Sequence, residues 1–135
     1  MNQDKKILLV DDDPPFINLY TAVFQSFGFN FSVAQNGLEA LDKAKKEHPY
    51  LILLDIMMPE MSGFEVLNRL KQDPQTKDIT VWMITNLPEQ MNKEKAISLG
   101  ATDYLFKSSY TPKRVCQKIQ EFLGDQTSET PTKTV

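Results

Sequence analysis

A chain of 135 residues is long enough for one globular domain and leaves no room for a second domain of ordinary size. Its hydrophobic content of 41% and charged content of 24% are ordinary for a soluble globular protein, and its net charge of −3 argues against a nucleic-acid-binding surface. No apolar run approaches the roughly 20 residues that span a bilayer, and the single cysteine, Cys116, cannot form an internal disulfide. We therefore expect a cytoplasmic protein that contacts neither nucleic acid nor membrane directly.

Short apolar runs and longer stretches with helical spacing follow one another along the chain, and they predict five strands, each followed by a helix. Residues 51–54 are apolar at every position, which is typical of a central strand in a parallel sheet that is covered on both faces. Pro14 and Pro112 mark helix starts, where the missing N–H would be unpaired in any case, and Gly28 marks a helix end. The expected strands cover about 7–10, 29–34, 51–54, 79–85 and 103–107, and the expected helices cover about 14–27, 36–47, 63–72, 88–99 and 112–123.

Five such units in succession require right-handed crossovers, and therefore predict an α/β fold with a single doubly wound parallel sheet. Residues 1–124 would form this domain, and the polar segment 125–135 would be a flexible tail or linker stub. His48, the only histidine, is expected to cap a solvated helix end, and Cys116 is expected to be a small buried hydrophobe. An apolar stripe in the first helix predicts core packing by Phe16, Leu19, Tyr20, Val23, Phe24 and Phe27.

Acidic residues follow two of the expected buried strands. Asp11 and Asp12 come directly after residues 7–10, and Asp55 comes directly after residues 51–54. The carboxyl ends of parallel strands meet at one edge of the sheet, where ligands bind in open α/β folds. Clustered carboxylates raise one another's pKa unless a cation neutralises them, and sites made only of oxygen ligands suit Mg²⁺. The sequence therefore predicts a Mg²⁺ site at this edge.

The fourth and fifth expected strands end on a hydroxyl, Thr85, and an ammonium, Lys107. A carboxylate can accept a phosphoryl group when Mg²⁺ and a lysine neutralise the charge on the transferring oxygens. Asp55 is the best acceptor, because it alone ends a central buried strand. Asp11 and Asp12 begin a loop that can fold around the metal ion instead.

Four segments in this order resemble the receiver domain of two-component response regulators: ILLVDDDPP, LILLDIMMPEMSG, VWMIT and GATDYLFK. The resemblance covers residues 5–124 and implies a flavodoxin-like sheet with strand order 2-1-3-4-5. It also implies that Asp55 takes a phosphoryl group from a phosphohistidine on a histidine kinase or a histidine phosphotransfer protein. Asp12, Asp55 and the Met57 backbone carbonyl would bind Mg²⁺, with Asp11 contributing largely through water, and Lys107 and Thr85 would hold the phosphoryl oxygens.

The resemblance further implies a conformational switch. The ring of Tyr104 would turn inward when Thr85 moves toward the phosphoryl group, and the surface of the fourth helix, fifth strand and fifth helix would report this change to a downstream protein. The chain would be a monomer or a phosphorylation-dependent dimer, and would catalyse only its own phosphorylation and dephosphorylation. One departure concerns Ser108, which stands where the family has a proline after the lysine. We expect a trans Lys107–Ser108 bond, since a non-proline cis bond costs roughly 3 kcal/mol.

Methionines follow the expected acceptor, and we interpret Met57, Met58 and Met61 as packing residues. Met57 and Leu87 would also stand at the mouth of the pocket, where apolar side chains exclude water from the phosphorylated aspartate. This arrangement predicts slow loss of the phosphoryl group.

Three other functions share single features with this sequence. An aspartyl phosphatase of the haloacid dehalogenase type shares the Asp-x-Asp spacing of Asp11 and Asp13, but Pro14 and Pro15 stand where it should have Gly and Thr or Val, and the chain is too short for its cap domain. A flavodoxin would need a Ser/Thr/Gly-rich loop for the flavin phosphate, and the acidic loop here would repel that group. A phosphorylation-independent interaction module is harder to reconcile with the complete set of site residues.

Overall fold

The computed structural model describes residues 5–124, which form five parallel strands alternating with five α-helices. The strands are β1 (Ile7–Val10), β2 (Phe31–Ala34), β3 (Leu51–Leu54), β4 (Thr80–Thr85) and β5 (Asp103–Phe106). The helices are α1 (Pro14–Ser26), α2 (Gly37–Glu47), α3 (Gly63–Gln72), α4 (Glu89–Ser98) and α5 (Pro112–Phe122). The sheet order β2-β1-β3-β4-β5 confirms the predicted fold and strand order. The predicted tail, 125–135, lies outside the described residues.

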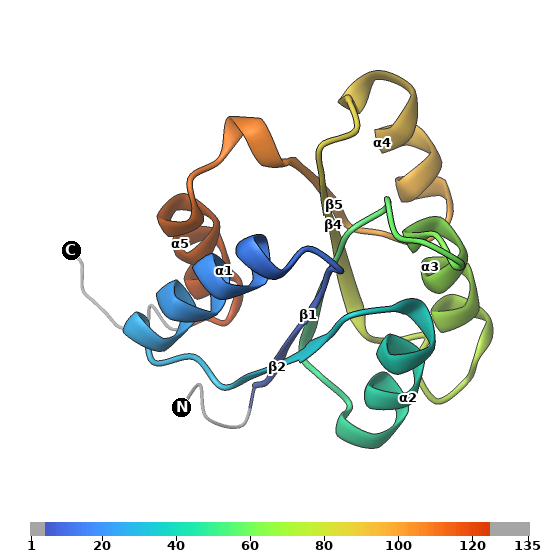
Figure 1. The fold of residues 1–135 in the computed structure, drawn as a ribbon. Coiled ribbons are helices and arrows are strands. Elements are labelled where there is room, and N and C mark those ends of the chain that lie inside the picture. The colour runs from blue at the N-terminus through green and yellow to red at the C-terminus, as the bar shows by residue number, and fades with distance from the viewer. Residues whose placement is uncertain (1–4, 125–135) are drawn as a thin grey trace.

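Helices cover both faces of the sheet. Figure 1 shows α1 and α5 on one face and α2, α3 and α4 on the other. The side chains of β3 alternate between the two cores: Ile52 and Leu54 pack toward α2, α3 and α4, whereas Leu51 and Leu53 pack toward α1 and α5. All four are fully buried, which confirms that this strand lies at the centre of the fold.

Three predicted strand boundaries are wrong because local turns take the flanking residues. The second strand begins at Phe31 rather than Phe29, since the Phe29 N–H donates to the Phe24 carbonyl and so completes the helix-ending turn at Gly28. The fourth strand begins at Thr80 rather than Ile79, since the Ile79 N–H donates to the Thr76 carbonyl. The fifth strand ends at Phe106, and Lys107 opens a 3₁₀ turn, Lys107–Ser109. The lysine therefore lies just beyond the strand, not in it.

Most side-chain predictions for the helices are confirmed, but Leu19 is not a core residue. Its side chain is 53% exposed, whereas Ile17, which the predicted stripe omits, is buried together with Tyr20 and Phe24. His48 is exposed and ends α2 in a left-handed conformation, and Cys116 is buried. Within residues 5–124, the helices are all too short or too polar to cross a membrane.

Candidate phosphoryl-transfer site

The backbone fixes two acids at the carboxyl edge of the sheet. The Asp11 N–H donates to the Ala34 carbonyl at 3.1 Å, and the Asp55 N–H donates to the Val10 carbonyl at 3.0 Å. Each bond extends the parallel pairing by one residue beyond the strand, so both side chains start from the rigid sheet rather than from a loop. Carboxylate oxygens of Asp11, Asp12 and Asp55 consequently lie within 4.8 Å of one another. The predicted acidic cluster therefore exists.

The loop after β3 passes close to the backbone of Asp55, and Gly63 makes this possible. The Gly63 N–H donates to the Ile56 carbonyl at 2.8 Å, and an added Cβ at Gly63 would lie 2.0 Å from the Asp55 carbonyl oxygen. No side chain larger than hydrogen fits here without moving the strand end. The sequence pattern alone did not indicate this role for Gly63.

Lys107 supplies the cation that the sequence predicts for this site. Its Nζ lies 2.9 Å from Asp11 Oδ2 and 3.8 Å from Asp55 Oδ2, and its side chain is 14% exposed. Among the described residues, Lys107 is the only cation that forms an ion pair with the cluster of three carboxylates. This excess of negative charge, together with the all-oxygen ligand set, fits a divalent cation such as Mg²⁺.

The folded chain raises the pKa of the Asp55 carboxyl. Burial raises the pKa of this carboxyl to about 6, and the nearby Asp11 charge adds to the effect, while Lys107, Thr85 and the Met57 N–H act in the opposite direction. Burial also raises the pKa of Asp11, against the lowering effect of its bond to Lys107. The two buried carboxylates are therefore incompletely compensated by the protein's own groups.

Thr85 and Tyr104 both form hydrogen bonds with the backbone of Leu87, which lies two residues beyond the end of β4. The buried Thr85 hydroxyl accepts a hydrogen bond from the Leu87 N–H at 3.3 Å, and the Tyr104 hydroxyl donates to the Leu87 carbonyl at 2.7 Å. Tyr104 is 2% exposed, so its ring lies inward.

Three further predictions concern the rim of the site. Met58 is buried and Met61 packs on the core, but Met57 is 58% exposed, so its interpretation as a packing residue is wrong. Leu87 is half-buried and packs against the core cluster on the α2–α4 face. The Lys107–Ser108 bond is trans, as predicted, since residues 5–124 contain no cis peptide bond.

The chain is similar to known signalling proteins over most of its length. Residues 7–120 match the response regulator receiver domain. The chain is 34% identical to the polar-differentiation response regulator DivK of Brucella ovis, with 90% of this chain and 98% of DivK covered. It is 36% identical to the alkaline phosphatase synthesis transcriptional regulatory protein PhoP of Bacillus subtilis, with 89% of this chain and 49% of PhoP covered. The chain thus spans about half the length of PhoP.

A solved structure shows the same fold. The chemotaxis protein CheY4 of Vibrio cholerae aligns with a TM-score of 0.79 and 30% sequence identity, covering 87% of this chain and 97% of CheY4. The family match, the relatives and the strand order agree with the residues gathered at the sheet edge. The chain belongs to the receiver domain family of two-component response regulators.

Proposed function

We propose that Asp55 of this receiver domain accepts a phosphoryl group from a phosphohistidine. Receiver domains are signalling phosphoacceptors rather than classical enzymes, and they act between histidine kinases and downstream targets. In the transfer, an Asp55 oxygen forms a bond to phosphorus, the P–N bond breaks, and the imidazole leaves with the electron pair. One observation supports Asp55 above its neighbours: it is buried but not in a short ion pair, whereas Asp11 binds Lys107 at 2.9 Å and Asp12 is exposed.

The groups around Asp55 suit the transferring phosphoryl group. Lys107 has three N–H donors, and its distance of 3.8 Å from Asp55 leaves it within reach of an oxygen bound there. Thr85 accepts a bond from the Leu87 N–H, and its own O–H remains able to donate to a phosphoryl oxygen. Both residues would therefore hold developing negative charge on the phosphoryl oxygens.

We assign the Mg²⁺ ligands to Asp12, Asp55 and the Met57 carbonyl, with Asp11 acting largely through water. The support for this is the close approach of the three carboxylates and the raised pKa of Asp55, which a divalent cation would lower. When bound, Mg²⁺ supplies charge neutralisation at the phosphoryl oxygens. The chain's own residues provide the nucleophile, the lysine and the hydroxyl.

The partners we propose are a histidine kinase or histidine phosphotransfer protein as donor, and a protein target at the face formed by α4, β5 and α5, with the exchange taking place in the cytoplasm. On α4, Met91 is 83% exposed and Ile97 is 44% exposed. Thr85 and Tyr104 would connect the site to α4 through Leu87, which precedes that helix by two residues. The Tyr104 ring would take its inward position as Thr85 moves toward the phosphoryl group.

The rival phosphatase and flavodoxin functions have less support. The dehalogenase-type phosphatase needs a second acid two residues beyond Asp11, but Asp13 does not belong to the acidic cluster formed by the described residues. The flavodoxin function needs a phosphate cradle after β1, where this chain places two clustered carboxylates. The family match favours neither.

Incubation with a small acyl phosphate and Mg²⁺ tests the proposed function. We expect intact-protein mass spectrometry to show the addition of one phosphoryl group to the parent and none to Asp55→Asn. A parent that stays unmodified under conditions that saturate Mg²⁺ would contradict the proposal.

Asp12→Ala should weaken Mg²⁺ binding strongly, because it removes a carboxylate ligand from the cluster. Affinity is measured by titration of Trp82 fluorescence or by calorimetry at pH 8. The control is Asp13→Ala, which removes an adjacent exposed acid that makes no capping bond to α1. In the parent, affinity should also fall below about pH 6 as Asp55 takes up a proton. Equal affinities for Asp12→Ala and Asp13→Ala would disprove the ligand assignment.

Met57→Asn should shorten the lifetime of the phosphorylated state several-fold. An exposed apolar side chain two residues beyond Asp55 excludes water, whereas an amide can orient a water molecule toward phosphorus. Phosphoryl loss is followed after removal of the donor, with Mg²⁺ in excess, and Met91→Asn on α4 serves as the exposed methionine control. Leu87→Glu probes the second proposed gate, although Leu87 also packs against the core. Identical decay rates in the parent and both gate variants would contradict the gating role.

A further inference from the structure

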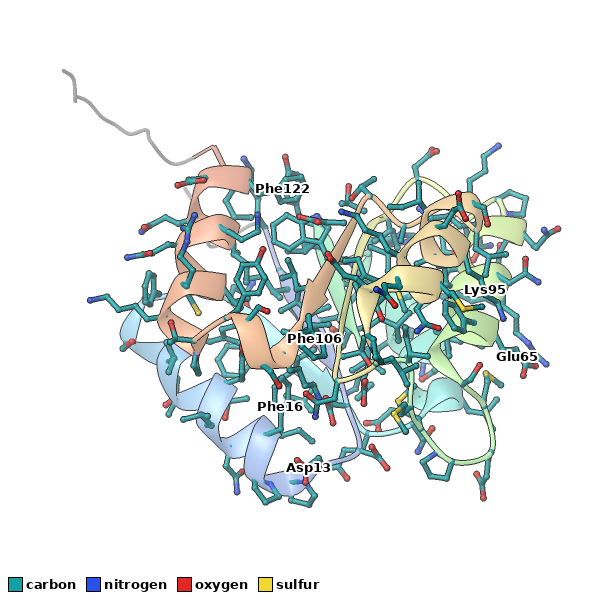
Figure 2. All side chains as sticks on the ribbon, turned by 90° about the horizontal axis from the view of Figure 1, so that it is seen from above. Asp13, Phe16, Glu65, Lys95, Phe106 and Phe122 are labelled. Carbon is teal, nitrogen blue, oxygen red and sulfur yellow. The ribbon has the colours of Figure 1, made fainter. Side chains whose placement is uncertain are left out.

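An aromatic ring forms one wall of the lysine site. Phe16 is the third residue of α1, and the Nζ of Lys107 lies 3.9 Å from the centroid of its ring. Figure 2 shows Phe16 between Asp13, which precedes α1, and Phe106, which ends β5. The ammonium group therefore has the ring of Phe16 as one neighbour and the carboxylates of Asp11 and Asp55 as the others. Sequence patterning assigned Phe16 only to core packing.

The ring of Phe16 is itself held by the core. Tyr20, one helical turn later, stacks on it with a centroid distance of 4.3 Å and an interplanar angle of 28°. Tyr20 is 2% exposed and makes an edge-on contact with the fully buried Phe24. Phe16 is thus the outer member of an aromatic row that begins in the core and ends at the ammonium group of Lys107. A ring supported in this way offers a fixed surface to a flexible side chain.

The side chain of Lys107 starts outside the sheet. Its four-carbon chain starts from a short 3₁₀ turn rather than from the sheet, and the next two residues, Ser108 and Ser109, are exposed. An aromatic face attracts an ammonium group within about 6 Å without using any of its N–H donors. The ring can therefore orient the ammonium while its donors remain available for oxygen atoms.

We propose that Phe16 is a positioning residue for Lys107. Its ring fixes the ammonium group over the carboxylates and shields one side of it from water, so that the lysine meets the phosphoryl oxygens in a defined place. This inference deepens the proposed function and rests on it, because positioning matters only if Lys107 binds the transferring group.

The contact between the Phe16 ring and the end of the Lys107 side chain can be detected by NMR without measuring activity. Protons close to the face of an aromatic ring resonate upfield, so the Cε methylene signals of Lys107 should be shifted upfield in the parent and absent in Lys107→Ala. We expect Phe16→Leu to remove the upfield shift, and Phe16→Tyr to keep it. The control Phe27→Leu removes a half-buried ring that packs on Phe29 at the opposite end of α1, and it should leave the signal in place. A parent without an upfield-shifted lysine signal would overturn the proposal.

A double-mutant cycle then tests the effect on phosphoryl transfer from a small acyl phosphate with saturating Mg²⁺. Phe16→Leu should lower the rate constant about fivefold in the parent background, with Phe16→Tyr close to the parent and Phe27→Leu unchanged. In the Lys107→Ala background, Phe16→Leu should have no further effect, because the group that it positions is gone. A purely structural role would lower the rate equally in both backgrounds, and that outcome would overturn the inference.

Failure of the inference and failure of the proposed function give different results. If Lys107→Ala is slow but Phe16→Leu matches the parent, then the ring does not position the lysine and the proposed function stands. If Lys107→Ala and Asp55→Asn both accept phosphoryl groups at the parent rate, then the proposed function itself is wrong. Thermal unfolding of each variant identifies any that fails to fold, and Phe16→Tyr and Phe16→Leu are compared only where both are folded.

Discussion

Asp55→Asn should be more stable than the parent protein when Mg²⁺ is absent and the pH is above about 7. The reason is that the folded chain raises the pKa of Asp55 from 3.8 to about 6, so that the ionised carboxylate opposes folding. The difference between these two values corresponds to about 3 kcal/mol, which we treat as the upper end of the expected gain. An amide of the same shape removes the buried charge.

The stability advantage of Asp55→Asn over the parent should grow as the pH rises. Between about pH 4 and pH 6 the folded parent binds more protons at Asp55 than the unfolded chain, so its free energy of unfolding falls as the pH rises. The advantage of Asp55→Asn should therefore be small near pH 4 and reach its full size above pH 6. Urea unfolding at several pH values measures it, with Asp13→Asn as the exposed control.

Mg²⁺ at 100 times its dissociation constant should offset most of this difference in stability. A ligand that binds only the folded state stabilises it by about 2.7 kcal/mol at 100 times its dissociation constant. The parent should gain this stabilisation and Asp55→Asn should gain much less, because it lacks one ligand carboxylate. If Asp55→Asn were less stable than the parent without Mg²⁺ at pH 8, our description of Asp55 as an uncompensated buried charge would be wrong.

Gly63→Ala should destabilise the fold by about 3 kcal/mol or more, since overpacking against a rigid backbone is costly. The added Cβ would lie 2.0 Å from the Asp55 carbonyl oxygen and 2.7 Å from the Ile56 Cα, and neither atom can rotate away. The same displacement would move Asp55, so Mg²⁺ affinity should fall as well. Both effects come from one clash at the end of the central strand.

Gly28→Ala is the matched control for Gly63→Ala. Gly28 has a φ of +74° and no atom within 4 Å of an added Cβ, so its substitution brings backbone strain without a clash. Its expected cost is about 1–2 kcal/mol, with Mg²⁺ affinity unchanged. Urea unfolding and metal titration of the two variants separate steric from conformational effects. A Gly63→Ala protein as stable as Gly28→Ala would show that the loop relaxes around the extra methyl group.

The parts of the site that could be predicted from the sequence are those that the strands fix directly. Asp11 and Asp55 each follow a fully apolar run, and a parallel sheet brings such strand ends together whatever the detailed packing. Chain order and periodicity therefore sufficed for the acidic cluster and for the parallel sheet, whereas the strand order came from the resemblance to the receiver family. Thr85 was placed correctly for the same reason, as the last residue of β4.

The remaining features depend on contacts that no local pattern encodes. Phe16 and Lys107 are far apart in the sequence, and only the packing of α1 beside the turn after β5 brings ring and ammonium together. The inward ring of Tyr104 depends on the path of the backbone at Leu87, which the strand pattern does not specify. The apolar stripe of α1 included Leu19 because spacing alone does not distinguish the edge of a buried face from its centre. Gly63 could have been recognised only from the approach of its loop to Asp55.

The identity of the acceptor is the central claim, and reductive trapping tests it most directly. Borohydride reduces an acyl phosphate but not a free carboxylate, and would convert phosphorylated aspartate to homoserine. After phosphorylation with a small acyl phosphate, reduction and proteolysis, peptide sequencing by mass spectrometry should find homoserine at position 55. Homoserine at position 11 or 12, or a phosphorylated protein that borohydride leaves unchanged, would contradict the account.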